Sequence, residues 1–283
     1  MPNVLEPDAT SRPSSPGASE TRRTTNITTL VGRLSDVGLK RELDEDALLT
    51  TEMTQFAQAG GQIIGLYAVA DGMGGASAGE VASKMVTETM AREVTQKIFV
   101  PRLASPGVEL DYSGILKAAI EQANTDVLSA RTHAHSDMGS TVVAALLVGS
   151  QAHIANVGDS RAYLIACDAI TQITRDHSLV QELAERGAIA EAEMRTHPHR
   201  NYILRNVGDK PKVLVDLYQV EMAPGQSLLL CCDGLWGMLS DAVIQAVLAS
   251  AKTPQDACNE LIAAANEAGG RDNITAVIVE RVG

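Results

Sequence analysis

The amino-acid sequence predicts an α+β fold built mainly from antiparallel strands. Its apolar segments of strand length follow one another in runs, and its segments of helical periodicity come in pairs. These segments do not alternate as regular β-α-β units, and the sequence contains no internal repeat. This order favours antiparallel sheets covered by helices over a doubly wound parallel sheet.

The N-terminal residues 1–26 differ in composition from the rest of the chain. They are rich in Ser, Thr and Pro and contain few large apolar residues. Such a segment buries too little apolar surface to offset the entropy lost when it becomes ordered. We therefore expect a disordered tail over residues 1–26, a solvated extension rather than a docking arm, and a folded body over 27–283.

The first half of the folded body predicts one buried strand and two helices. Residues 62–70 are apolar, include strand-forming residues and end at Asp71-Gly72, a common turn dipeptide. Apolar residues recur at helical spacing over 78–98 and again over 115–128. We expect these two segments to form amphipathic helices.

The middle of the chain predicts three strands, over residues 141–148, 152–156 and 161–166. The last two are joined by residues 157–160, Val-Gly-Asp-Ser. Gly and Asp tolerate the dihedral angles of tight turns, so we expect a hairpin at this joint.

The last third of the chain predicts three helices and two strands, marked by local start and stop signals. Ser178 and Gln181 form a capping box ahead of the first helix, and Gly187 can end it. Thr253 can cap the last helix, which Gly269-Gly270 can end. The expected elements are helix 179–186, strand 227–232, helices 241–250 and 254–267, and strand 274–280.

Composition excludes several classes of protein. The 283 residues include 23 Lys and Arg against 35 Asp and Glu, so the net charge of −12 argues against nucleic acid as a partner. The longest purely apolar run, 142–148, is far shorter than the roughly 20 residues of a membrane helix. No signal-peptide pattern is present, and four cysteines do not make a disulfide framework. We expect a cytoplasmic protein without a membrane partner, with a monomer as the simplest state.

Five aspartates stand at or beside the ends of predicted strands. If neighbouring strands bring these ends together, several carboxylates meet at one edge of the core and repel one another unless a cation is present. Oxygen ligands of this kind suit Mg²⁺ or Mn²⁺. Each aspartate taken singly is better explained as a turn residue, so spacing alone leaves both interpretations open. The five residues are Asp46, Asp71, Asp137, Asp233 and Asp272.

Eight segments between about residues 32 and 281 resemble, in family order, the motifs of the metal-dependent type-2C protein phosphatases, the PPM family, in their bacterial form. Each segment is modestly specific, but together they are highly specific. The segments are 36–46, 70–75 (Ala-Asp-Gly-Met-Gly-Gly), 136–141 (Ser-Asp-Met-Gly-Ser-Thr), 155–163, 174–178, 197–205, 230–236 and 271–275 (Arg-Asp-Asn-Ile-Thr).

This resemblance implies both a fold and an activity. The fold would be a four-layer α-β-β-α sandwich of two mostly antiparallel sheets flanked by helices, with a catalytic domain over 27–283 and a flap subdomain at about 177–210. The activity would be metal-dependent hydrolysis of phosphoserine and phosphothreonine on proteins by a metal-bridged water. The expected partner is a phosphorylated protein substrate, and the reaction would oppose a serine/threonine kinase by acting on the kinase or its targets.

The resemblance also implies two core Mn²⁺ or Mg²⁺ ions and a weaker third ion. Asp71, Asp233 and Asp272 would hold one core ion. Asp46, the bridging Asp71 and the backbone carbonyl of Gly72 would hold the other. Two ions about 3.5–4 Å apart can lower the pKa of a shared water and neutralise charge on the phosphoryl group.

The remaining two assignments concern the third ion and the substrate. By the same resemblance, Asp137 and Asp233 would hold the third ion, and Arg41 would bind the substrate phosphate. The planar guanidinium of arginine suits phosphate better than lysine does. Taken alone, Arg41 would be interpreted as a surface residue paired with Glu42 or Asp44.

Two residues depart from the pattern of many relatives. Asp44 stands where many relatives have Asn, which adds a negative charge beside the site. Met73 stands where some relatives, chiefly eukaryotic, have a His proposed as general acid, so the proton donor would be a metal-bound water or a flap residue such as His177. A structural role is the favoured interpretation of His177. Asp159 matches a residue that shapes a turn and is not expected to be a ligand.

Other functions remain as alternatives. The leading one is a catalytically weak phosphatase-fold module that regulates or binds a partner; Asp44 is the feature that favours it. A dinucleotide-binding glycine loop at 72–77 is disfavoured, because Asp71 would repel a pyrophosphate and no regular β-α-β unit follows. A cysteine-based phosphatase is disfavoured, because no Arg stands six residues after any cysteine.

Overall fold

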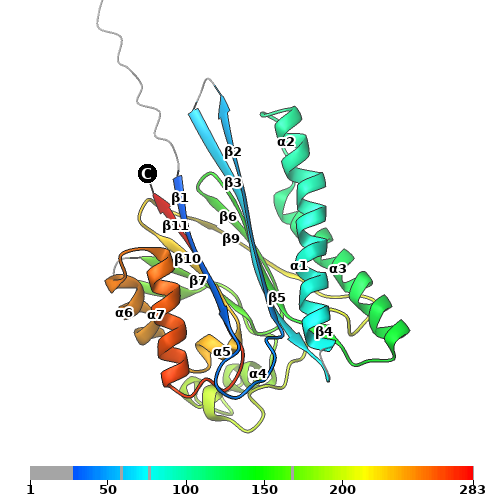
Figure 1. Cartoon of the computed structure of the whole chain (residues 1–283), viewed down its shortest axis with the longest axis vertical. Coiled ribbons are helices and arrows are strands. Elements are labelled where there is room, and N and C mark those ends of the chain that lie inside the picture. The colour runs from blue at the N-terminus through cyan, green and yellow to red at the C-terminus, as the bar shows by residue number, and fades with distance from the viewer. Residues whose placement is uncertain (1–27, 58–59, 76–77, 167–168, 283) are drawn as a thin grey trace, which may run out of the picture.

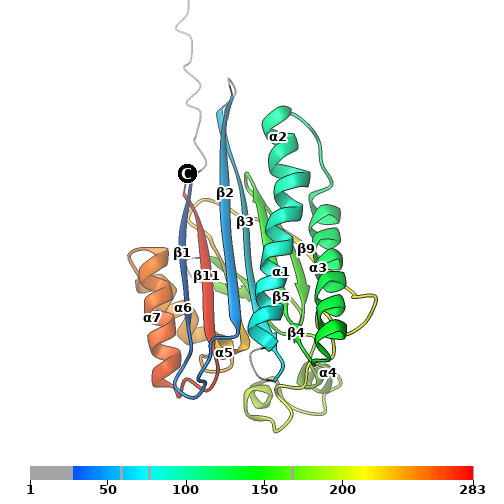
Figure 2. The ribbon, with the colours of Figure 1, turned by 45° about the vertical axis from the view of Figure 1, so that its right-hand side comes forward.

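The computed structural model describes residues 28–57, 60–75, 78–166 and 169–282. Two sheets lie face to face, and helices cover both outer faces (Figures 1 and 2). Every pair of neighbouring strands in these sheets is antiparallel. The α+β class and the four-layer sandwich expected from the sequence are therefore confirmed. The predicted tail over 1–26 lies outside the described residues.

The first sheet has five strands and contains both β1 and the last strand of the chain. Its β1 pairs with β11 along its whole length, so the two ends of the described chain are joined in one sheet. In spatial order the strands are β1 (Thr28–Asp36), β11 (Ile274–Val282), β10 (Ser227–Cys231), β7 (Arg161–Ala166) and β8 (Ala169–Gln172).

The second sheet has six strands, five of them on its main path, and is built around a long hairpin of its first two strands. A short strand, β4 (Gly139–Ser140), pairs with the end of that hairpin. In spatial order the strands are β2 (Asp46–Ala57), β3 (Gly60–Met73), β5 (Val142–Val148), β6 (Gln151–Val157) and β9 (Asp216–Glu221), with β4 beside β3 off this path.

Helices cover the outer faces in two groups, and shorter helices lie at one end of the sandwich (Figure 1). The second sheet is covered by α1 (Ala78–Val94), the π-helical turn η1 (Thr95–Phe99), α2 (Val100–Ala104) and α3 (Tyr112–Ala134). The first sheet is covered by α6 (Asp241–Ser250) and α7 (Pro254–Glu267). The shorter helices are α4 (Leu179–Glu185), the 3₁₀ helix η2 (Glu191–Thr196) and α5 (Asp233–Trp236).

Strand β3 shows why its sequence is apolar almost throughout. Its Ile64, Leu66 and Ala68 belong to the core beneath α1 and α3. The alternate residues Tyr67 and Val69 belong to the core between the two sheets. Because successive side chains of a strand point to opposite faces, a central strand of a four-layer sandwich is buried on both sides. The same argument explains the apolar run of β5.

The predicted helices are confirmed, and those with capping signals have accurate bounds. Ser178 accepts a hydrogen bond from the backbone N–H of Gln181, as expected for the N-cap of α4. Thr253 caps α7 in the same way, and α6 and α7 have the predicted bounds. The predicted helix over 78–98 continues further, through η1 into α2. The strands β1, β2, β8 and β9 were not predicted from the sequence.

The hairpin predicted at residues 157–160 is wrong. Strand β6 pairs with β5 and β9 in the second sheet, whereas β7 pairs with β10 and β8 in the first. The turn at Gly158, with a φ of +113°, therefore passes the chain from one sheet to the other. Turn residues identify a change of direction, but the choice of pairing partner is made by distant strands.

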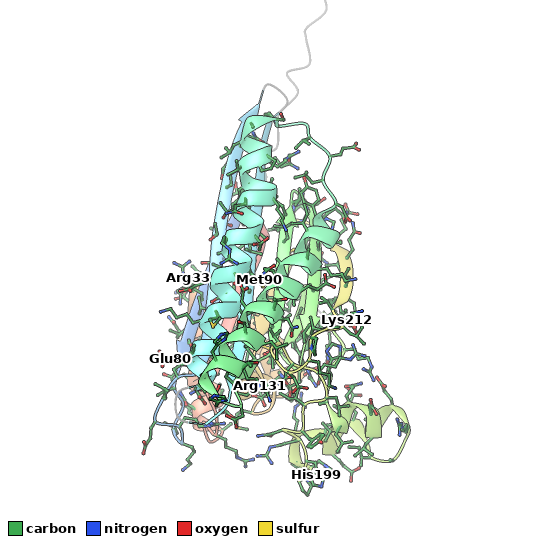
Figure 3. The ribbon with its side chains drawn as sticks, turned by 90° about the vertical axis from the view of Figure 1, so that its right-hand side faces the viewer. Arg33, Glu80, Met90, Arg131, His199 and Lys212 are labelled. Atoms are coloured by element: carbon green, nitrogen blue, oxygen red, sulfur yellow. The ribbon has the colours of Figure 1, made fainter. Side chains whose placement is uncertain are left out.

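The segment at about 177–210 contains α4, η2 and the loops around them. It projects at one end of the sandwich, where Figure 3 shows His199. This is the end at which α5 also lies (Figure 1). Within the described residues, no helix combines the length and apolar character needed to cross a membrane.

Candidate metal centre

Asp46 and Asp71 face each other across the hairpin of the second sheet. Asp46 is the first residue of β2, and its direct partner on β3 is Asp71. Asp71 is held at this position by Thr141, whose Oγ1 accepts from the Asp71 N–H at 3.0 Å and whose N–H donates to the Asp71 carbonyl at 2.8 Å. Two like charges directly opposite each other destabilise a strand pair, so this register indicates a functional constraint.

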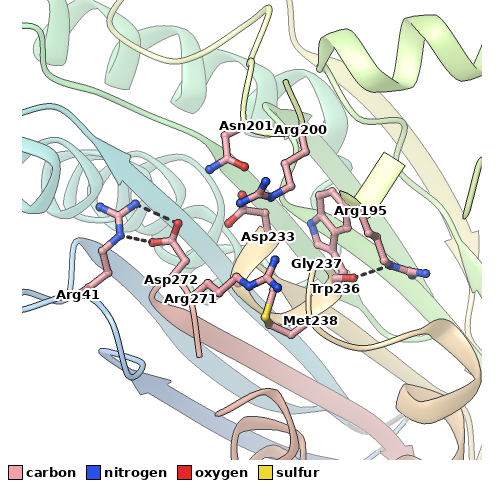
Figure 4. A pocket seen from close by; sticks show the side chains of 11 residues that line it. Arg41, Arg195, Arg200, Asn201, Asp233, Trp236, Gly237, Met238, Arg271 and Asp272 are labelled. Carbon is pink, nitrogen blue, oxygen red and sulfur yellow. Dashed lines mark hydrogen bonds and ion pairs between the residues drawn. The ribbon is translucent and has the colours of Figure 1, made fainter. Parts of the chain in front are cut away.

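Asp233 and Asp272 come from the first sheet. Asp233 follows β10 and opens the short helix α5. Asp272 lies just before β11, the strand paired with β10. Both residues line one cavity, which Figure 4 shows from close by. Strand pairing within the sheet thus brings together two aspartates that are distant in sequence.

Burial, with the charge of a neighbouring carboxylate, raises the pKa of three aspartates of this group. Asp46, Asp71 and Asp233 are half-buried residues whose carboxyl groups lie among protein atoms. Burial raises the pKa of Asp46 to about 7, and the charge of Asp233 adds to the shift. Burial and then the charges of Asp46 and Asp233 hold the pKa of Asp71 well above its usual range. Burial and the charge of Asp272 raise the pKa of Asp233 to about 6.

These shifts agree with a site that takes up divalent cations. An enclosed group of like charges is unfavourable unless protons or metal ions compensate it. One oxygen of Asp46, Oδ1, is buried without a hydrogen-bond partner among the described residues. All candidate donors are oxygens, the ligand type preferred by Mg²⁺ and Mn²⁺. The donor set therefore fits the ions that the sequence predicted.

The side chains are nevertheless not arranged around a metal ion. Among the described residues, no three His, Cys, Asp or Glu side chains form a group that could hold one. Asp272 is instead bound by Arg41, with Nε 2.9 Å from Oδ1 and Nη2 2.9 Å from Oδ2 (Figure 4). Arg41 thus supplies the positive charge that a cation would otherwise bring to Asp272.

A hydrogen-bond chain that the sequence analysis did not identify links Asp44 to Asp46. Ser35 Oγ donates to Asp44 Oδ2 at 2.7 Å and lies 2.7 Å from Thr275 Oγ1. Thr275 Oγ1 donates to Asp46 Oδ2 at 2.6 Å. The two hydroxyl groups supply two hydrogens for three contacts. All three can be hydrogen bonds only if one of the two carboxyl groups is protonated and donates to its hydroxyl partner instead of accepting from it. This requirement agrees with the raised pKa of Asp46.

Asn273 fixes the loop that carries Arg41. Its side-chain nitrogen donates to the carbonyls of Val37 and Leu43, at 3.0 and 2.9 Å. Its side-chain oxygen accepts from the N–H of Glu45 at 2.9 Å. Asn273 lay inside a segment already recognised by resemblance, but only the structure shows which loop it holds.

Asp137, Gly72 and Arg41 stand at the margin of the carboxylate group. Asp137 is exposed, and its Oδ1 accepts from the N–H of Gly75 at 3.1 Å. Gly72 packs so closely on α1 that a Cβ would lie 2.1 Å from the Gly79 carbonyl oxygen. The partners of Arg41 are Asp272 and, at 3.7 Å, Glu45, rather than the neighbours considered from sequence.

His177 is a buried structural residue. Its Nδ1 accepts from the N–H of Gly158 at 3.1 Å, and its Nε2 lies 3.1 Å from Asp216 Oδ2. Burial lowers its pKa below the usual value. These contacts hold the flap segment against the turn that changes sheets, which agrees with the structural interpretation of His177.

Comparison with known proteins identifies relatives across most of the chain. The family model described as "Protein phosphatase 2C" matches residues 39–274. The serine/threonine phosphatase stp of Listeria innocua is 38% identical over 221 residues, which cover 75% of this chain and 83% of that protein. The solved structure of the Mycobacterium tuberculosis serine/threonine phosphatase PstP/Ppp is similar with a TM-score of 0.77 and 32% identity, covering 91% of this chain and 100% of that one.

A second solved structure contains metal. The catalytic domain of the serine threonine protein phosphatase PstP, in complex with two manganese ions, is similar with a TM-score of 0.76 and 30% identity. The match covers 91% of this chain and 100% of that chain.

Proposed function

Because the chain belongs to the protein phosphatase 2C family and is a serine/threonine phosphatase of that type, we propose that it uses the enclosed carboxylates to hold the metal ions of its reaction. The observation that carries this proposal is the convergence of Asp46 and Asp71 from one sheet with Asp233 and Asp272 from the other. Their mutual repulsion gives the site a reason to bind divalent cations.

The proposed ligand sets follow the resemblance. Asp71, Asp233 and Asp272 would hold one core ion, and Asp46, Asp71 and the carbonyl of Gly72 the other. When bound, a pair of Mn²⁺ or Mg²⁺ ions supplies an activated bridging water and neutralises charge on the phosphoryl group. Manganese is supported by the two-ion complex of the similar PstP domain.

The third ion would be held by Asp137 with Asp233. Asp137 is exposed, and its Oδ1 accepts its one side-chain hydrogen bond among the described residues, from the Gly75 N–H. An exposed monodentate donor contributes less than an enclosed carboxylate, because water competes for the ion. We therefore propose weaker binding at this third position.

Arg41 is proposed to bind the substrate phosphate. Its guanidinium already binds the two oxygens of Asp272 side by side, the same fork geometry that a phosphate would use. The Arg41 side chain is 46% exposed, so substrate can reach it. Release of Asp272 would free both groups at once, the carboxylate for a cation and the guanidinium for phosphate.

The substrates of a serine/threonine phosphatase are phosphoproteins. We propose that this chain, acting as a cytoplasmic monomer, removes phosphate from phosphoserine and phosphothreonine added by a serine/threonine kinase. The accessible edge of the metal centre supports a protein substrate, because the lining residues Arg271 and Asn201 are exposed.

Phosphate release with different ions tests this function. The wild type, Asp71→Asn and a control, Asp209→Asn, would be assayed on an aryl phosphate and a phosphothreonine peptide with Mn²⁺, Mg²⁺ or chelator. Asp209 is exposed and pairs only with Arg131 at 3.4 Å among the described residues. We expect activity that requires metal, is lost by roughly a thousandfold in Asp71→Asn and is retained in Asp209→Asn. Turnover in chelator would contradict the metal mechanism, and a folded wild type inactive with every ion would favour the binding-module alternative.

A further inference from the structure

A cavity of about 150 Å³ lies beside the candidate metal centre and is unusually rich in arginine. Asp233 and Asp272 line it on one side, and Trp236 and Met238 contribute apolar wall. The arginines come from three parts of the chain: the loop after β1, the flap segment and the turn before β11. Figure 4 shows them around the cavity. They are Arg41, Arg195, Arg200 and Arg271.

Two of these arginines are already engaged with protein groups. Arg41 binds Asp272, as described above. Arg195 donates from Nε to the carbonyl of Trp236 and from Nη2 to Asp241 Oδ1, each at 2.9 Å. Their guanidinium groups therefore help to form the cavity wall. The roles of the other two arginines, Arg200 and Arg271, are not explained by such contacts.

Arg200 donates from its backbone N–H to the His197 carbonyl at 3.1 Å. Within the described part of the chain, the guanidinium groups of Arg200 and Arg271 have no hydrogen bond or ion pair. Arg200 lies close enough to Asp233 for its charge to lower the pKa of that carboxyl, against the upward effect of burial. A protein with a net charge of −12 thus directs two uncommitted guanidinium groups at one small cavity. Such groups are suited to bind an anion in fork geometry.

We propose that Arg200 and Arg271 form an anion subsite that takes a second anionic side chain of the phosphoprotein substrate, next to the phosphoresidue being hydrolysed. The shared chemistry of the ligand is a carboxylate or a phosphate on a side chain near that phosphoresidue. This proposal rests on the proposed phosphatase function and specifies its preferred substrates.

The size of the cavity favours a side chain over a free metabolite. Pockets for whole small molecules usually enclose about 300–1,000 Å³. This cavity has about 150 Å³, and its apolar wall can contact the methylene groups of an acidic side chain. Trp236 is held in place, because its Nε1 donates to the Asp159 carbonyl at 2.9 Å and Arg161 stacks on its ring at 3.6 Å.

The balance of charge links this subsite to the metal centre. Asp233 and Asp272 would repel an incoming anion while their charges are uncompensated. Cations at these carboxylates would cancel that repulsion, so the attraction of Arg200 and Arg271 for the anion would remain. The subsite should therefore act on substrates only when the metal centre is loaded.

A peptide panel tests the proposal. A parent phosphothreonine peptide with neutral flanks would carry Glu, Gln or phosphoserine in turn at each of three positions on either side. With Mn²⁺ present, we expect a roughly five- to tenfold higher kcat/KM for Glu or phosphoserine over Gln at one or more positions. The preference should decrease at high salt, because exposed charges are screened.

Variants test whether Arg200 and Arg271 cause the preference for acidic peptides. Arg200→Gln with Arg271→Gln should bring the Glu-to-Gln ratio of kcat/KM to about one. The control is Arg186→Gln, in the same flap segment, where Arg186 is exposed and pairs with Glu182 at 3.0 Å. Equal rates for acidic and neutral peptides in the wild type, or an unchanged ratio in the double variant, would overturn the proposal.

A binding measurement separates this proposal from the phosphatase function. Fluorescence anisotropy of labelled peptides, with a phosphonate in place of the hydrolysable phosphate, reports the preference without turnover. Preferential binding of acidic peptides in Mn²⁺, lost in the double variant, supports the subsite even if no peptide is hydrolysed. That result would contradict the proposed phosphatase function and leave the subsite standing. Turnover without any preference would contradict the subsite and leave the phosphatase function standing.

Discussion

Enclosed carboxylates occur in two regions of this protein and are balanced in opposite ways. Asp176 is completely buried, and Arg161 binds it through three contacts of 2.7–3.1 Å. At the metal centre, burial raises the pKa of Asp46, Asp71 and Asp233, and the charge of a neighbouring carboxylate adds to each shift. Within the described residues none of the three forms an ion pair with Lys or Arg. The same side chain is thus compensated by the protein in one place and left for a ligand in the other.

This difference separates structural from functional charge. A buried ion pair with well-formed hydrogen bonds satisfies itself, and losing one partner leaves an isolated charge. A group of like charges reduces the stability of the folded protein and is explained by what it binds. The two regions are physically connected, because Arg161 stacks on Trp236 of α5, the helix that Asp233 opens.

The largest expected effect comes from removing a charge at the metal centre. Asp233→Asn should lower kcat/KM in Mn²⁺ by roughly a thousandfold or more, about 4 kcal/mol of transition-state stabilisation. It should not lower the free energy of unfolding in chelator, because it relieves repulsion with its neighbours. Steady-state kinetics and urea denaturation measure the two quantities. A large loss of stability without loss of activity would mean that the charge of Asp233 is structural rather than functional.

Breaking the ion pair between Arg161 and Asp176 should lower the stability of the protein, which Asp233→Asn should not do. Arg161→Met leaves Asp176 buried and unpaired, so the free energy of unfolding should decrease by about 3 kcal/mol. Adding Asp176→Leu to this variant should restore much of the loss, because the isolated charge is then removed. Urea denaturation of the single and double variants checks this. An exposed control, Arg186→Met, should change stability by less than about 1 kcal/mol.

The free energy of unfolding of the metal-free protein should depend on pH, which gives a further test of the contrast between the two regions. Asp46 has a folded pKa of about 7, whereas an unfolded Asp titrates near about 3.9. Between these values the folded state binds more protons, so the free energy of unfolding should fall as pH rises, by up to about 1.4 kcal/mol per pH unit for each such proton.

Urea denaturation in chelator at several pH values between 4.5 and 7.5 measures this slope. Asp46→Asn should reduce the slope, and Mn²⁺ at pH 7.5 should restore stability to the wild type, because the ion replaces the protons. A slope that is identical in Asp46→Asn would contradict the assignment of the proton to this group.

The smallest expected effect concerns Asp44, the residue that departs from many relatives. Its charge contributes to the raised pKa of Asp46. Asp44→Asn should therefore weaken Mn²⁺ binding about two- to fivefold, because a negative charge near the cation is lost. Titration calorimetry at pH 7.5 measures the change. Tighter binding in the variant would mean that Asp44 disturbs the centre instead of supporting it.

Local signals explain which predictions were accurate. The bounds of α7 followed from its Thr253 cap, from Pro254 at its start and from Gly269-Gly270 after its end, signals that act within a few residues. The edge-region strands β1 and β9 were missed, because their side chains alternate between exposed and covered positions and give no apolar run. The joint at 157–160 was assigned to a hairpin, because a turn sequence does not specify which strands will pair.

The candidate site also has features that the sequence predicted and features that it did not. Resemblance selected Asp46, Asp71, Asp233 and Asp272 from the sequence, and the structure places them at the facing ends of the two sheets. The pairing of Arg41 with Asp272 could not be predicted, because both residues have nearer candidate partners along the chain. The contacts of Asn273 were hidden for the same reason.

The sequence by itself determined the α+β class, the capped helices, the family and the identity of the acidic residues. Those properties depend on composition, on short-range periodicity and on motifs read along the chain. Only the tertiary structure decided that β6 and β7 belong to different sheets, that Arg41 compensates Asp272, and that Arg200 and Arg271 share a cavity. These facts depend on contacts between residues far apart in the chain, whose energies are set by burial and distance rather than by sequence neighbours.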